Sequence, residues 1–92
     1  MIVRIMGEGQ VRLAESHLAD LNKLDDELLA EMEKGDGPGF RRTLQALLAR
    51  VRDLGVPLPD DSLEPSELIL PSPDATLEEV RDLLSDDGLI PG

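Results

Sequence analysis

Residues 38–54, PGFRRTLQALLARVRDL, hold the pattern that decides the fold. Apolar residues recur there at alternating spacings of four and three, which places them on one side of an α-helix. They are Phe40, Leu44, Leu47, Val51 and Leu54, and Leu48 widens the stripe. Asp36 or Gly37 can cap the start of this helix, which has a proline in its first turn. Gly55 and Pro57 favour its end, so we predict an amphipathic helix over 38–54.

The preceding segment, residues 15–34, has the same period. Its apolar positions are Leu18, Leu21, Leu24, Leu28 and Met32. Gly35 follows directly, and a glycine at this point is typical of a helix C-terminus. Only a short connection separates the two predicted helices. We therefore expect them to pack side by side as an antiparallel αα-hairpin.

Two short strands are predicted in residues 1–13, MIVRIMGEGQVRL, because apolar and polar side chains alternate there. Val3 and Ile5 flank Arg4, and Val11 and Leu13 flank Arg12. Gly7 and Gly9 lie between the two runs and suit a hairpin turn, because glycine adopts positive φ readily. Two strands alone are only marginally stable in water, so we expect a third short strand near 68–70.

The C-terminal part of the chain differs in composition from the helices, because residues 56–75 contain five prolines. Leucine and isoleucine residues interleave with these prolines, which a free linker would lack. We therefore predict an extended, acidic strap that lies on the helices. Thr76 and Glu79 have the spacing of a capping box, which predicts a short final helix over 76–87. Together these elements predict a single small α+β domain over residues 1–92.

The charge of the chain is strongly acidic and unevenly placed. Nine Lys and Arg face 20 Asp and Glu, which gives a formal net charge of −11. This balance argues against a nucleic-acid partner and against direct binding to anionic lipid. Residues 35–54 are the exception, with four arginines and two carboxylates, whereas residues 55–92 hold one basic and ten acidic side chains. Either the acidic strap lies near the arginine-bearing helix, or the arginines meet an acidic partner.

No pattern of catalytic, cofactor-binding or metal-ligating residues stands out. Cys is absent, the only aromatic residue is Phe40, and His17 has no nucleophile at a matching position. The paired aspartates lack the alternating ligands of a calcium loop. Residues 7–12 lack the third glycine of a dinucleotide fingerprint and lead into a strand. We therefore predict no enzyme activity, no cofactor and no metal.

The remaining candidates form a predicted partner surface. Two adjacent aspartates lie at the C-terminal end of the last predicted helix, where acidic groups are electrostatically unfavourable, and this placement hints at recognition. With the arginines of the second helix, the candidate surface comprises Arg41, Arg42, Arg50, Arg52, Asp86 and Asp87. The unpaired edge of a small ribbon adds an expectation of self-association. No apolar run has the length of a membrane span or a signal-peptide core, so we expect a cytoplasmic location.

Three blocks of the sequence carry a family resemblance. They are MIVRIMGEGQ at 1–10, LNKLDDEL at 21–28 and LPDDSLEPSELILPSPDATLEEVRDLLSDDGLIPG at 58–92. They resemble the PspA-associated (PspAA-type) family, small domains encoded beside phage-shock protein A in actinobacteria and some other prokaryotes. The family carries no catalytic motif. The resemblance implies a context of envelope stress and a membrane-binding, filament-forming coiled-coil partner.

From this resemblance we expect a non-catalytic accessory protein of the phage-shock response. It would bind or modulate phage-shock protein A and reach the membrane only through that partner. Docking would use a leucine-rich helical surface or the edge of the hairpin. The alternative is a small acidic regulatory module that binds a transcription factor or a sigma factor.

Overall fold

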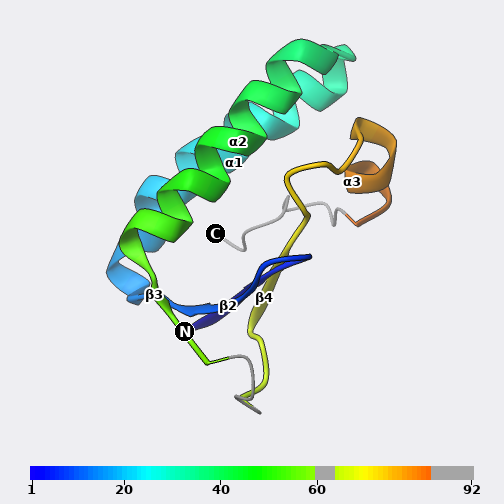
Figure 1. Ribbon diagram of the computed structural model, residues 1–92. Coiled ribbons are helices and arrows are strands. Elements are labelled where there is room, and N and C mark those ends of the chain that lie inside the picture. The colour runs from blue at the N-terminus through cyan, green and yellow to red at the C-terminus, as the bar shows by residue number, and fades with distance from the viewer. Residues whose placement is uncertain (60–63, 84–92) are drawn as a thin grey trace.

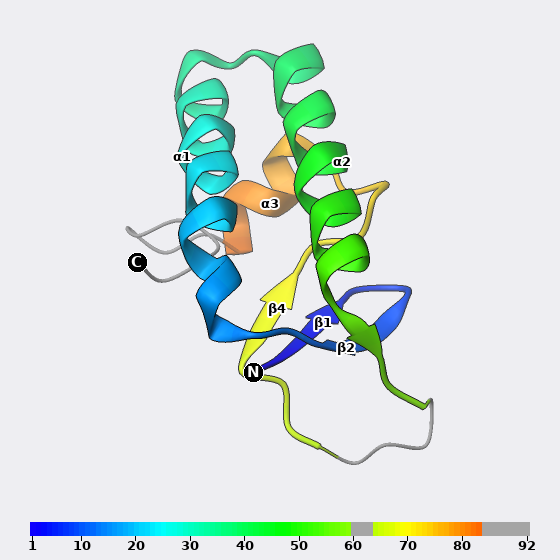
Figure 2. The same cartoon turned by 90° about the vertical axis from the view of Figure 1, so that its left-hand side faces the viewer.

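The computed structural model describes residues 1–59 and 64–83, shown in Figure 1 and turned by 90° in Figure 2. The elements in order are β1 (Ile2–Ile5), β2 (Gly9–Arg12), the 3-10 helix η1 (Glu15–His17), α1 (Leu18–Lys34), α2 (Gly37–Leu54), β3 (Val56–Pro57), β4 (Leu68–Leu70) and α3 (Leu77–Leu83). The helices α1 and α2 run side by side on one side of a small sheet (Figure 2). The predicted α+β class is confirmed.

The helix α2 begins as its sequence predicts. Of the two candidate caps, Asp36 takes the position, because its Oδ1 accepts a hydrogen bond of 3.0 Å from the backbone N–H of Gly39. The predicted and observed bounds of α2 differ by one residue. A capping side chain of this kind satisfies one of the backbone donors that the first turn leaves unbonded.

The helix α1 ends as predicted and starts later than predicted. Gly35 has φ of 71°, the left-handed conformation that glycine tolerates best, and its N–H reaches back to the last turn of the helix. At the other end, residues 15–17 form a 3-10 turn instead of the predicted first turn of α-helix. No side chain caps the start of α1, so the tighter turn leads into it.

Gly55 ends α2 for a different reason from Gly35. Its backbone is extended, with φ of −88° and ψ of 158°, and the chain enters β3 directly. A Cβ at this position would lie 2.9 Å from Cγ2 of Val11 and 2.9 Å from the carbonyl oxygen of Val51. Glycine is therefore needed here for the close approach of α2 to β2, and not for a left-handed turn.

The sheet has four strands in the order β3-β2-β1-β4. β1 and β2 form the predicted antiparallel hairpin, with Val3 opposite Val11. The predicted third strand is present as β4, which pairs parallel with β1. The strand β3, which pairs antiparallel with β2, was not predicted. As a result the hairpin occupies the centre of the sheet, and both edge strands come from the region predicted as a strap.

The inner face of the sheet packs against the helices to form the core. It contributes Val3, Ile5, Val11, Leu68 and Leu70, with Leu13 just after β2. The leucine stripes of α1 and α2 close the core from the other side, and Val80 of α3 completes it. These apolar side chains are the main favourable contribution to folding in a chain of this size.

Residues 64–66 of the strap lie on the outer face of the sheet, the face opposite the helices. Gln10 Nε2 donates hydrogen bonds of 2.8 Å to the backbone oxygen of Glu64 and to Oγ of Ser66. Arg12 pairs with Glu64 at 3.2 Å. The predicted position on the helices is therefore wrong for residues 64–66. The alternation of β2 explains it: Gln10 and Arg12 flank the buried Val11, so their side chains point away from the helices and hold residues 64–66 on that side.

The strap reaches α2 only farther along, where Gln45 Nε2 donates a hydrogen bond of 2.9 Å to the backbone oxygen of Pro73. α3 then begins as predicted, with the N–H of Glu79 bonded to Oγ1 of Thr76 at 3.2 Å. The predicted C-terminal end of this helix, to residue 87, falls outside the described residues.

Candidate functional site

The four arginines predicted as one surface are all exposed but lie on different sides of α2. At about 100° of rotation per residue, Arg41 and Arg52 share a side and stand about 16 Å apart along the axis. Arg42 and Arg50 are turned away from them. Asp86 and Asp87, the acidic members of the predicted surface, lie outside the described residues. Among the described residues, the structure therefore does not bring the predicted set together.

Arg52 is engaged within the molecule. Its Nε donates a hydrogen bond of 2.7 Å to Oε1 of Glu8, in the turn between β1 and β2, and its second nitrogen pairs with Oε2. The guanidinium of Arg52 holds the pKa of the Glu8 carboxyl below its ordinary value of 4.5, mainly through this hydrogen bond. Arg52 therefore ties the turn of the hairpin to α2, where the sequence suggested a bond to the strap or to a partner.

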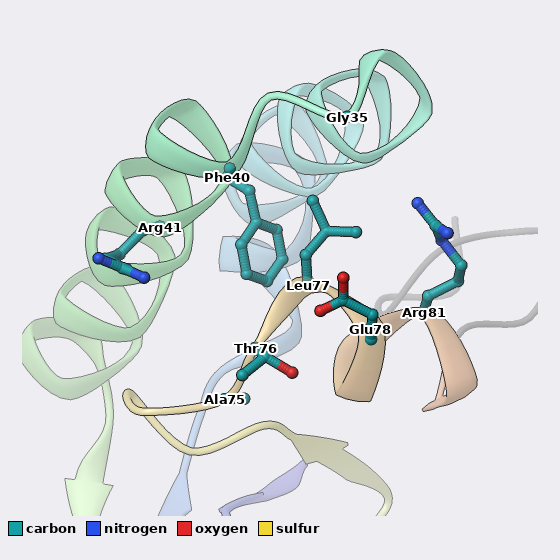
Figure 3. A pocket seen from close by; sticks show the side chains of 9 residues that line it. Gly35, Phe40, Arg41, Ala75, Thr76, Leu77, Glu78 and Arg81 are labelled. Atoms are coloured by element: carbon teal, nitrogen blue, oxygen red, sulfur yellow. The ribbon is translucent and has the colours of Figure 1, made fainter.

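Arg41 borders a cavity of about 390 Å³ between the α1–α2 turn and α3 (Figure 3). Phe40 and Leu77 lie at its centre, and Arg41 and Arg81 lie on opposite sides of the Phe40 ring. Arg81 is held at 3.4 Å from the backbone oxygen of Met32, near the end of α1. Because the two guanidinium groups do not converge, this cavity lacks the paired donors that recognise a carboxylate or phosphate.

Arg42 borders a groove of about 470 Å³ between α1 and α2. Its apolar lining is sparse, from Leu24 and two alanines, Ala30 and Ala46. The remaining lining residues, Glu27, Glu31, Lys34, Arg42 and Thr43, are charged or polar. The hydroxyl of Thr43 is hydrogen-bonded to Glu31. The groove therefore presents mixed charge over little apolar area.

The outer face of the sheet carries a surface that was not predicted. Among the described residues, the large apolar side chains classed as exposed are Met6, Val56 and Ile69, with 48%, 63% and 53% of their area exposed. Ile69 lies beside Arg4 in the register of β1 and β4. Met6 follows two residues after Arg4, and its N–H bonds to the backbone oxygen of Leu70, so it continues the same face.

We define the outer-face patch as Arg4, Met6 and Ile69. The alternation of Val3, Arg4 and Ile5 already indicates in the sequence that Arg4 points away from the core. That Ile69 lies beside it could be found only once β4 was known to pair with β1. Val56 lies on the same face at the opposite edge strand, across from Arg12. Because Glu64 and Ser66 cross the face near Gln10 and Arg12, they separate Val56 from the patch.

Within 1–59 and 64–83, no three His, Cys, Asp or Glu side chains gather in a group that could hold a metal ion. Nor does this part of the chain contain a helix with the length and apolar character needed to cross a bilayer. What the arrangement offers is binding surface: the groove between the helices, the cavity beside α3 and the outer-face patch.

The comparisons with known proteins give one match. The chain matches the family model described as PspA-associated protein (PspAA) over residues 1–92, its whole length. The chain therefore belongs to the PspA-associated protein family, as its sequence blocks indicate. Neither the search of curated proteins nor the search of solved structures gave a match.

Proposed function

We propose, on the premise of membership in the PspA-associated protein family, that this chain is a non-catalytic accessory protein of the phage-shock response that binds and modulates phage-shock protein A. The observation that carries the proposal is the family match over residues 1–92. The name of the family states an association with PspA. The burial and pairing of residues on each surface then limit where phage-shock protein A can bind.

Docking through the leucine stripes, which the sequence favours, is not available to a partner. Leu44, Leu47 and Leu48 of α2 are fully buried, and so are Leu21 and Leu28 of α1. Exposing these leucines to a partner would lose the free energy that their burial contributes to folding. A partner must therefore bind the folded chain on the side chains that its packed helices and sheet leave outside.

Docking through the edges of the hairpin is also disfavoured. β3 covers the free side of β2, and β4 covers the free side of β1. The new edge strands are only two and three residues long, and proline lies within β3 and immediately after β4, at Pro57 and Pro71. Short strands and prolines protect edges against pairing with another chain. The edge that suggested self-association is thus occupied within the molecule, and faces are the better candidates for contact.

The proposed location is the cytoplasm, with indirect access to the membrane. A net charge of −11 repels anionic lipid, so the chain would reach a membrane only through phage-shock protein A. The same charge would speed encounter with a basic surface on the partner at low salt.

The test is a titration of the full chain with purified phage-shock protein A at low and at physiological salt. We expect saturable binding that weakens as salt rises, because screening reduces the long-range attraction. Absence of binding at low salt would overturn the proposal. A pull-down from native extract provides the second arm. Capture of a DNA-binding protein that competes with DNA would favour the regulatory module instead.

A further inference from the structure

We infer that the outer-face patch, made of Arg4, Met6 and Ile69, is the surface that binds the partner, and that its occupant is one amphipathic helix bearing a carboxylate beside apolar side chains. This inference rests on the proposed function and names the surface that it uses. The apolar part comes first. Met6 and Ile69 expose about half of their area on one face, although the chain buries most of its other large apolar side chains in the core. Adjacent exposed apolar residues of this size mark binding surfaces more often than single ones do.

The second element is the charge of Arg4. This arginine is exposed, lies beside Ile69 in register, and forms no ion pair with any residue in the described ranges. By contrast, Arg12 and Arg52 of the same region are paired with Glu64 and Glu8. Arg4 lies between Ile69 of β4 and Gln10 of β2, and a guanidinium binds a carboxylate strongly once a partner excludes water. The patch is therefore complementary to a single carboxylate of the partner, although the chain as a whole is acidic and favours a partner with basic residues elsewhere.

The position of the patch on the face of the sheet favours a helix over a strand as its occupant. The apolar groups project from the face of the sheet, and the edge of β4 ends at Pro71. A helix lying across an open sheet face would build a third layer, with the core helices on the other side. Its apolar residues at spacings of three and four would contact Met6 and Ile69, and a neighbouring carboxylate would reach Arg4.

Two other occupants fit the charges less well. In a two-fold dimer formed through the patch, two chains of net charge −11 would approach each other. An anionic membrane would attract Arg4 but repel the rest of the chain. A helix of another protein avoids both objections if one carboxylate contacts Arg4 and basic residues elsewhere on that protein attract the acidic chain.

The experiment compares exposed apolar residues on the same sheet face. Ile69→Asp and Val56→Asp each place a carboxylate at a site with more than half of its area exposed, but only Ile69 belongs to the patch. We expect Ile69→Asp and Arg4→Glu each to weaken binding to phage-shock protein A by about tenfold or more. Val56→Asp should change the affinity by less than about threefold. Far-UV circular dichroism and thermal unfolding establish that each variant is folded.

The variant Met6→Asp tests the same patch beyond the last residue of β1, so the inference stays testable if Ile69→Asp does not fold. Equal losses at Ile69 and Val56 would overturn it and leave the proposed function standing. If Ala46→Glu weakens binding and neither Met6→Asp nor Ile69→Asp does, the partner binds in the α1–α2 groove, and the inference is overturned as well. Self-association of the wild type that Ile69→Asp abolishes would assign the patch to a second copy. If the wild type does not bind phage-shock protein A at all, the proposed function fails first.

Discussion

The αα-hairpin and the sheet differ in how far apart in the sequence their contacting segments lie. The hairpin of α1 and α2 is built from adjacent segments, and its bounds follow from a helical period and from residues at its ends. The sheet joins residues 2–12 to residues 56–57 and 68–70, which are far away in the sequence. The two regions nevertheless share one core, because the inner face of the sheet packs on the leucines of the helices. The two regions therefore stabilise each other, but local sequence patterns predict the whole αα-hairpin and only part of the sheet.

The largest expected effect tests whether the two regions form one cooperative unit. Leu70 of β4 is fully buried in the shared core, so Leu70→Ala should reduce the free energy of unfolding by about 2–5 kcal/mol. Urea unfolding followed by far-UV circular dichroism should show one transition in which helices and sheet unfold together. Ile69→Thr, at the exposed neighbour, is the control and should change stability by no more than about 0.5 kcal/mol. A helical signal that survives loss of the sheet would show that the regions fold separately.

The junction between the regions should give the next largest effect. At Gly55 an added Cβ would press on Val11 and on the backbone of Val51, so Gly55→Ala should destabilise the fold by about 1–3 kcal/mol. Gly37→Ala is the matched control, because its Cβ would meet no atom within 4 Å. Thermal unfolding of the control should show a change of at most about 1 kcal/mol, toward higher stability. Similar losses in both variants would contradict the close packing of α2 on β2.

The strap can be probed with two glutamines that both donate to its backbone. Gln10 is 9% exposed and makes two hydrogen bonds, whereas Gln45 is exposed and makes one. Gln10→Ala should reduce the free energy of unfolding by about 1–2 kcal/mol, because it removes both hydrogen bonds that this mostly buried side chain makes to Glu64 and Ser66. Gln45→Ala should stay within about 0.5 kcal/mol. If chemical denaturation ranks the two variants in the reverse order, the strap is held mainly by α2 and not by the sheet.

The smallest effect concerns pH. Because Arg52 lowers the pKa of Glu8 in the folded chain, this pair stabilises the fold above the ordinary value of 4.5. The contribution is lost as pH falls through the lowered pKa of the folded state. It should be no more than about 1 kcal/mol, since both side chains are more than a third exposed. Unfolding measured from about pH 6 to about pH 3 should bring wild type and Glu8→Gln closer together. A constant difference over that range would argue against the pair.

The candidate site was less predictable than the fold. The exposure of each arginine of α2 followed from the helical period, but Arg52 turned out to pair with Glu8, 44 residues earlier. That pair depends on where the hairpin packs, which no local pattern encodes. The patch residue Ile69 was predicted within a strand, yet its neighbour Arg4 depended on the parallel pairing of β4 with β1.

The sequence by itself determined the two long helices, the N-terminal hairpin and the family, because helical period, capping residues and glycine positions act over a few residues. Only the tertiary structure decided that β3 exists, that β4 runs parallel to β1, and that residues 64–66 lie on the outer face of the sheet. The two residues of β3 carry too little pattern of their own to be recognised, and the partner and direction of β4 depend on hydrogen bonds with a distant segment. The surface proposed for the partner lies in that second group, because it forms only where distant strands meet.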